Sequence, residues 1–110
     1  MDKMDALAAF DALSQETRLD VLRLLIQAGP DGLPAGDIAG RLLVKQNTMS
    51  VNLKILTQAG LATFARDGRV IRYAANYPAV QGLIRFLMED CCGGRPELCV
   101  PDLAPPACDC

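Results

Sequence analysis

The residues best suited to chemistry lie at the C-terminal end, because all five cysteines fall within the last 20 of the 110 residues. They are Cys91, Cys92, Cys99, Cys108 and Cys110. Thiolates are soft ligands and the chain has no histidine, so a site made of Cys91, Cys92 and Cys99 would suit a soft, thiophilic ion. A structural zinc ion would need a fourth ligand, which Cys108 or Cys110 could supply.

The sequence around the adjacent cysteine pair favours a folded-back loop. We predict a last helix over roughly Pro78–Cys92, after which Gly93-Gly94 lets the backbone turn and bring Cys99 back to the pair. A thiol-redox switch is the main alternative, since neighbouring cysteines can oxidise. Cysteines are also common as small buried hydrophobic residues, but their density beside glycine and proline argues against a core here. The last two cysteines could form a second metal clamp, act as a delivery arm or be disordered.

Composition sets the compartment in which these thiols would act. A chain of this length, 51% hydrophobic, supports one small domain. The start MDKMDALAAF lacks a basic region followed by an apolar run, and no apolar stretch reaches the roughly 20 residues that span a bilayer. We therefore expect a cytoplasmic protein. Thiols stay reduced there, so clustered cysteines are more often metal ligands or redox sensors than disulfides.

The net charge of −2 is unevenly distributed along the chain. Residues 37–72 hold six basic and two acidic side chains, whereas acidic side chains dominate on both sides of this segment. The middle third could therefore face a phosphate backbone, although an ordinary mixed surface would give the same count.

Apolar periodicity predicts four helices before the last one. The second is nearly continuously apolar, which predicts a central place in the core, and Ser14 is expected to cap it. Gly60 is expected to close the fourth. The predicted ranges are 5–13, 15–28, 34–42 and 46–59.

The helix over 46–59 has two different faces. Its apolar face is predicted to hold Met49, Asn52, Leu53 and Leu56. The other face holds Asn47, Ser50, Val51, Lys54 and Gln58, with Gln46 and Thr48 in the first turn. Amides can pair with adenine edges and Lys54 can reach guanine or phosphate, so the pair of helices suits a helix-turn-helix in a major groove. A merely solvated polar face is the alternative for this helix taken alone.

The segment that follows predicts a β-hairpin. Two runs rich in β-forming residues, 61–65 and 70–74, flank Arg66-Asp67-Gly68-Arg69, and Asp-Gly between strands is a strong turn signal. Arg66 and Arg69 are expected at its tip, suited to phosphate or minor-groove contacts. Helix, turn, helix and basic hairpin in this order predict a mainly α, winged helix-turn-helix fold.

Several segments resemble the ArsR/SmtB-type metalloregulatory repressors over roughly residues 5–90. They are Leu13–Leu19, Val21–Leu25, Gln46–Ser50, Leu53–Leu56, Ala59–Leu61 and Asp67–Tyr73. The resemblance implies a homodimeric repressor that binds double-stranded operator DNA and releases it when a metal or metalloid ion binds. It also implies dimerisation through the first and last helices, here residues 5–13 and about 77–92.

Two departures from the family pattern bear on DNA recognition. Lys45 stands where the family usually has a serine that caps the recognition helix, so either Asn47 takes over the cap or Lys45 contacts phosphate. Val51 and Asn52 stand where two histidines are common, which predicts a different operator sequence. The expected DNA-binding residues are Lys45, Gln46, Asn47, Thr48, Ser50, Val51, Lys54, Arg66 and Arg69.

The family's usual metal sites are missing from this sequence. Residues 34–39 lack the cysteines of its arsenic box, and the zinc site on the last helix needs histidines. Some members place arsenic ligands as an adjacent cysteine pair plus a third cysteine after the last helix, which Cys91, Cys92 and Cys99 match. The resemblance thus implies As(III), or Sb(III), as inducer, with Cd(II), Pb(II), Bi(III) or thiol oxidation as alternatives, and no organic cofactor.

An enzymatic role, such as thiol-dependent arsenate reduction, is disfavoured. A reductase would need an oxyanion-binding loop around its nucleophile, and Arg95 is the only cation near the cysteines. We therefore expect a regulator that is not an enzyme. Residues 1–92 would form its DNA-binding and dimerisation domain and residues 93–110 its inducer-binding tail.

Overall fold

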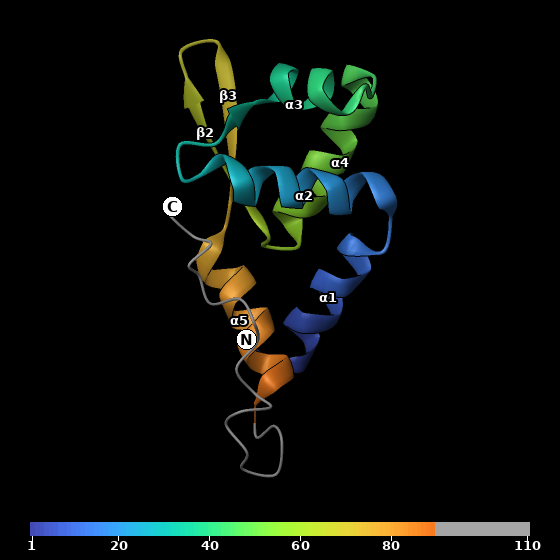
Figure 1. The fold of residues 1–110 in the computed structure, drawn as a ribbon, viewed down its shortest axis with the longest axis vertical. Helices are drawn as coiled ribbons and strands as arrows, with labels where there is room; N and C mark the ends of the chain where they lie inside the picture. The colour runs from blue at the N-terminus through green and yellow to red at the C-terminus, as the bar shows by residue number, and fades with distance from the viewer. Residues whose placement is uncertain (90–110) are drawn as a thin grey trace.

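The computed structural model describes residues 1–89, which form five helices and one small antiparallel sheet (Figure 1). The elements are α1 Lys3–Leu13, α2 Glu16–Ala28, β1 Leu33–Pro34, α3 Ala35–Leu42, α4 Gln46–Gln58, β2 Ala62–Asp67, β3 Val70–Ala75 and α5 Tyr77–Met88. The strand order is β1-β3-β2. Figure 1 shows the β2–β3 hairpin beside α3, with α1 and α5 at the opposite end of the molecule. The predicted winged helix-turn-helix fold is confirmed.

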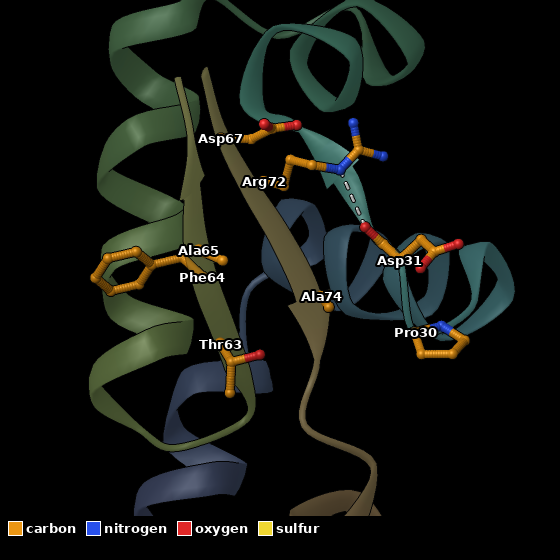
Figure 2. Close-up of a pocket in the computed structure, with 8 residues that line it drawn as sticks. All are labelled: Pro30, Asp31, Thr63, Phe64, Ala65, Asp67, Arg72 and Ala74. Atoms are coloured by element: carbon orange, nitrogen blue, oxygen red, sulfur yellow. Dashed lines mark hydrogen bonds between the residues drawn. The ribbon is translucent and has the colours of Figure 1, made fainter. Parts of the chain in front are cut away.

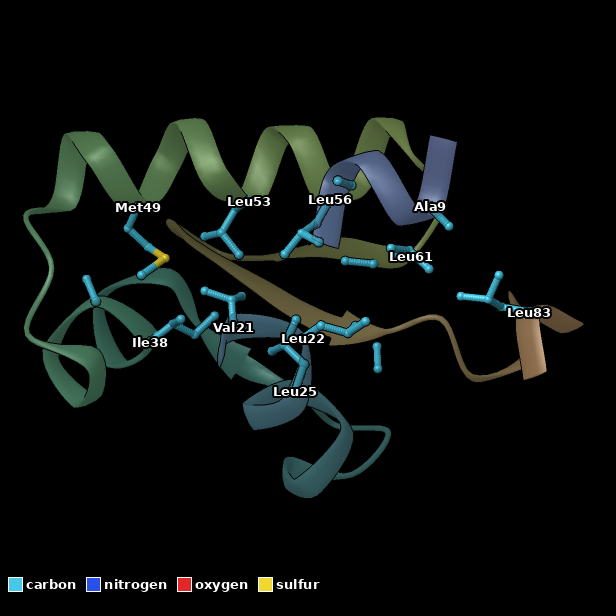
Figure 3. Packing of buried hydrophobic residues seen from close by; sticks show 14 of the residues in the cluster. Ala9, Val21, Leu22, Leu25, Ile38, Met49, Leu53, Leu56, Leu61 and Leu83 are labelled. Atoms are coloured by element: carbon cyan, nitrogen blue, oxygen red, sulfur yellow. The ribbon is translucent and has the colours of Figure 1, made fainter. Parts of the chain in front are cut away.

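The core lies where α2, α3, α4 and the sheet meet (Figure 3). The predicted inward face of α4 is confirmed, because all four of its residues are buried. The second helix is only partly as expected. Val21, Leu22 and Leu25 of α2 are buried, but Leu19 and Ile26 are 43% and 37% exposed, so α2 buries one face rather than its whole circumference.

The joint between α1 and α2 differs from the prediction. Ser14 does not cap α2; it ends α1, and its hydroxyl donates to the Asp11 carbonyl oxygen at 2.7 Å. Gln15 is the N-cap of α2, because its extended backbone lets the side-chain oxygen accept from the Arg18 N–H at 3.0 Å. The Ser14 backbone is not extended (φ −80°, ψ 9°), which is the physical reason that it cannot serve as the N-cap.

The hairpin turn is shifted by one residue from the predicted Asp-Gly. Asp67 still pairs with Val70, so the two-residue loop is Gly68-Arg69. Gly68 has φ +65° and Arg69 does not have a positive φ, as in type II′ turns, which place glycine first. Arg69 therefore stands at the tip as predicted, whereas Arg66 lies within β2, opposite Ile71.

The last helix is shorter than predicted. It ends at Met88, and Glu89 is extended (φ −60°, ψ 131°), so the expected continuation to Cys92 is wrong. Glu89 and the following Asp90 are acidic, and negative charge is unfavourable at the negative end of a helix dipole. Cys91, Cys92, Cys99, Cys108 and Cys110 all lie outside the described residues.

The start of α5 is tied to the rest of the domain by side chains. Asn76 accepts from the Ala79 N–H as the cap of α5 and donates to the Gly60 carbonyl oxygen at 2.8 Å. The Tyr77 hydroxyl donates to the Ile26 carbonyl oxygen at 2.9 Å. The first turn of α5 therefore contacts both the end of α2 and the turn that follows α4. No helix within residues 1–89 is both long and apolar enough to span a membrane.

Candidate nucleic-acid interface

The turn between α3 and α4 is closed by a left-handed residue. Leu43 has φ +56° and ψ +43°, and the Val44 N–H donates to the Ala39 carbonyl oxygen at 3.0 Å. Glycine is the usual residue in this conformation, because a side chain costs about 1–2 kcal/mol there. Leu43 is also 92% exposed, so no packing repays this cost within the described residues. The sequence pattern did not indicate this strained position.

The outward face of α4 carries the side chains that were predicted to contact DNA. Met49, Asn52, Leu53 and Leu56 turn inward, which leaves the polar residues on the solvent side. Val51, at 58% exposure, supplies an apolar surface among them that could meet a thymine methyl group. The predicted residues of this helix and its cap are all exposed: Lys45, Gln46, Asn47, Thr48, Ser50, Val51 and Lys54.

The first turn of α4 has no side-chain cap at its N-cap residue, which is Lys45. The suggestion that the cap moves to Asn47 is wrong, because α4 already starts at Gln46 and the Asn47 side-chain oxygen accepts from the Thr48 N–H at 2.8 Å. An N-terminus of this kind carries partial positive charge and backbone donors. With Lys45 beside it, this end of α4 suits an anionic partner.

The wing tip and the start of α4 share one hollow. Arg69 and Gln46 both line a cavity of ≈ 380 Å³ between the sheet and the starts of α3 and α4. Gly36 also lines the cavity, and a Cβ on it would make an ordinary van der Waals contact with Gln46 Nε2, at 3.6 Å. The remaining lining residues are Pro34, Ala35, Val70 and Ile71. The structure thus brings together predicted residues from the helix and the wing; the contribution of Gly36 was not predicted, although the small residues after Pro34 are visible in the sequence.

The outer face of the wing is a poor surface for phosphate. A hollow of ≈ 500 Å³ lies there, and Asp31 and Asp67 are among the residues that line it (Figure 2). Arg72 Nε donates to the Asp31 carbonyl oxygen and Nη2 to that of Gly32, each at 3.1 Å. Arg72 therefore holds the turn before β1 against β3, and the acidic groups favour DNA approaching from the side of Gln46 and Arg69.

The predicted metal ligands cannot be placed, because every cysteine is outside the described residues. Within residues 1–89, no three histidine, cysteine, aspartate or glutamate side chains come together in a way that could hold a metal ion. The described part of the chain therefore presents a candidate DNA surface, and the expected inducer site stays a prediction.

Comparisons with known proteins agree with this geometry. A family model described as a helix-turn-helix domain matches residues 13–63. The transcriptional repressor SdpR of Bacillus subtilis (strain 168) is 35% identical over 79 residues, which cover 72% of this chain and 84% of that protein. A probable mercury resistance operon repressor of Streptomyces lividans is 31% identical over 75 residues, covering 68% of this chain and 58% of that protein.

Solved structures that resemble this chain are also those of transcriptional regulators. An ArsR-like transcriptional regulator from Rhodococcus sp. RHA1 superposes with a TM-score of 0.67 at 32% identity, over 76% of each chain. The homodimeric winged helix-turn-helix DNA-binding domain Mb0332 of Mycobacterium bovis superposes with a TM-score of 0.64 over 79% of this chain and 81% of that one; at 23% identity it bears on the fold alone. The fold and the exposed α4 face define a winged helix-turn-helix transcriptional regulator. The chain belongs to the ArsR family of these regulators, whose members are not enzymes.

Proposed function

We propose that the protein is a homodimeric repressor that leaves its operator DNA when As(III), or Sb(III), binds Cys91, Cys92 and Cys99. The observation that carries the DNA-binding part is the shared hollow of Gln46 and Arg69 beside the exposed face of α4. In this arrangement Gln46, Asn47, Thr48, Ser50 and Val51 read base edges in a major groove. The basic side chains make the contacts to the phosphate backbone: Lys45, Lys54, Arg66 and Arg69.

Exposed apolar side chains on α1 and α5 support a dimer. The two helices contact each other, and each carries large apolar side chains that are exposed. A second copy of the chain would cover the large side chains there, and the Mycobacterium bovis domain with this fold is homodimeric. The exposed fractions are Met4 71%, Leu7 54%, Phe10 41%, Ile84 39% and Leu87 57%.

The position of the cysteines in the sequence after α5 supports coupling between ion binding and DNA binding. Cys91 follows the end of α5 at Met88 by three residues, so ligand binding there acts next to the proposed dimer face. At the other end of α5, the Asn76 side chain donates to the carbonyl oxygen of Gly60, which follows the end of α4 at Gln58 by two residues. A shift of α5 would therefore reach the DNA-reading helix. A coupling of about 1–3 kcal/mol would weaken DNA binding about 5- to 150-fold.

Ion-by-ion release from the operator tests this proposal. The operator is selected from random DNA with the reduced wild-type chain, and its affinity is then measured by fluorescence anisotropy during an arsenite titration. Antimony(III), Cd(II), Pb(II) and Bi(III) form further arms, and Hg(II) joins them because the Streptomyces lividans relative is named for mercury resistance. We expect As(III) or Sb(III) to lower the affinity within the range given above.

Cysteine variants separate the possible sites. Cys99→Ser should bind the operator as the wild type does and lose the response to arsenite, whereas the matched variant Cys108→Ser should keep it. Unchanged DNA affinity of the reduced wild type in arsenite would rule out the inducer, and release by diamide without any metal would favour the thiol-redox alternative. A wild type that binds no operator would rule out the repressor itself.

A further inference from the structure

Asn52 is the only polar side chain that is buried among residues 1–89, with 6% of its surface exposed. It lies on the inward face of α4 next to Met49 and Leu53, which are 1% and 0% exposed. A buried amide costs free energy unless its polar atoms are bonded, and an apolar side chain would fill the same place without that cost. Core packing alone therefore does not explain an asparagine here.

The partner of Asn52 is Arg18, which is 34 positions away in the sequence and lies on α2. Arg18 Nη1 donates to Asn52 Oδ1 at 3.4 Å, and Arg18 Nε donates to the Ala12 carbonyl oxygen at 2.6 Å. Ala12 belongs to the last turn of α1, where carbonyl groups lack helical partners and the helix dipole favours a cation. One guanidinium thus joins the end of α1 to the middle of α4.

The two hydrogen bonds of Arg18 restrict movements of α4 that the apolar core permits. Hydrophobic contact has no preferred direction, so α4 could rotate or slide slightly against its neighbours and keep most of its burial. The guanidinium is planar and rigid, and its donors are held at a fixed separation. With Nε bonded to the Ala12 carbonyl oxygen, a rotation of α4 that moves Asn52 Oδ1 away from Nη1 would break the longer of the two bonds, which is 3.4 Å.

We propose that Arg18 and Asn52 are positioning residues that fix the angle between α4 and α1 and so set the half-site spacing that the dimer accepts. The inference rests on the proposed function, because α1 belongs to the proposed dimer face and α4 reads the DNA. Each added base pair turns one half-site by about 35° and moves it by about 3.4 Å relative to the other. A rigid connection between α1 and α4 would give different affinities for operators of different spacing. A flexible connection would let α4 adjust to each spacing, so the affinities would be similar.

The test uses three palindromes that carry the half-sites selected with the wild type, separated by the selected distance and by one base pair fewer or more. The variants are Asn52→Leu and Arg18→Lys in the full chain. Arg23→Lys is the matched control, because it makes the same substitution at an exposed position of α2. Affinity for each palindrome, dimerisation by sedimentation and the melting temperature are measured for every variant.

We expect the wild type and Arg23→Lys to lose about tenfold in affinity when the spacing changes by one base pair. Asn52→Leu should melt at the wild-type temperature or above it, since leucine suits its apolar neighbours and the part-buried Arg18 can bond to water. Its affinities for the three palindromes should nevertheless fall within about threefold of one another. Arg18→Lys should show the same loss of discrimination while remaining dimeric.

Two results would overturn the inference. Asn52→Leu or Arg18→Lys could keep the full spacing preference, in which case the link does not set the geometry. The variants could instead lose affinity equally for all three palindromes, in step with a lower melting temperature, which would leave only a structural role. A wild type that binds no palindrome would refute the proposed function and this inference together, whereas the first two results refute the inference alone.

Discussion

Gly32 occupies a position where one added methyl group should strongly destabilise the fold. It has φ +68°, and a Cβ on it would lie 2.1 Å from the carbonyl oxygen and 2.8 Å from the carbonyl carbon of Tyr73. Both are backbone atoms of β3, so they cannot move aside as a flexible side chain would. Gly32→Ala would therefore push β1 away from β3, at the place where Arg72 bonds to the Gly32 carbonyl oxygen.

The expected cost of Gly32→Ala has two parts. Alanine in a left-handed conformation costs about 1–2 kcal/mol, and forcing a methyl group into an occupied place costs about 1–3 kcal/mol. Alanine returns about 0.4–1 kcal/mol by restricting the unfolded chain. The middle of these ranges gives a net loss of about 3 kcal/mol, and for a domain of this size each kcal/mol lowers the melting temperature by about 4–8 °C. We expect a drop of roughly 10 to 30 °C.

Gly68→Ala is the matched control for this substitution. Gly68 has nearly the same φ, +65°, but nothing lies within 4 Å of the position that its Cβ would take. It should lose only the conformational part, about 1–3 kcal/mol for a sparsely populated backbone region, less the gain of about 0.4–1 kcal/mol in the unfolded state. Thermal unfolding followed by circular dichroism at one protein concentration measures both variants, because the proposed dimerisation would make stability depend on concentration. Equal melting temperatures for Gly32→Ala and Gly68→Ala would refute the close-approach argument.

Two further predictions concern the DNA-reading region. Lys54→Ala should weaken binding to the operator and to unrelated DNA by the same factor and reduce the slope of log K against log salt by about 1, because it removes a phosphate contact. An unchanged salt slope in anisotropy titrations would show that Lys54 contacts bases instead. Leu43→Gly should raise the melting temperature by a few degrees, since relief of about 1–2 kcal/mol of backbone strain exceeds the roughly 0.5–1 kcal/mol entropic cost of glycine. A lower melting temperature would mean that Leu43 gains more from contacts than its 92% exposure allows.

The arrangement of α4 was predictable because it depends on a repeated signal. Apolar residues at helical spacing identify Met49, Leu53 and Leu56 as the inward face, and their neighbours must then face outward. The hairpin was predictable for a similar reason, since two runs of β-forming residues surround a glycine. A prediction that rests on a pattern over many residues stays correct even when one residue of the pattern is assigned wrongly.

The ends of elements were less predictable because each depends on one residue's backbone conformation. Ser14 and Gln15 are adjacent and both can accept hydrogen bonds, yet only Gln15 is extended enough to cap α2. In the hairpin, Asp67-Gly68 and Gly68-Arg69 both contain a residue that allows a tight turn. The register of β2 against β3 selects the second of them, and this pairing is a property of the folded sheet.

The number of basic side chains in a segment does not show which of them can contact DNA. The sequence places six basic side chains in residues 37–72. One of them, Arg72, is held by two backbone carbonyl groups and lines the hollow on the outer face of the wing, together with Asp31 and Asp67. Arg18 lies outside that segment, yet it bonds to the buried amide of the DNA-reading helix. The influence of a cation on DNA binding therefore depends on which groups it bonds to in the folded chain, because a guanidinium held by carbonyl groups orients protein elements instead of binding phosphate.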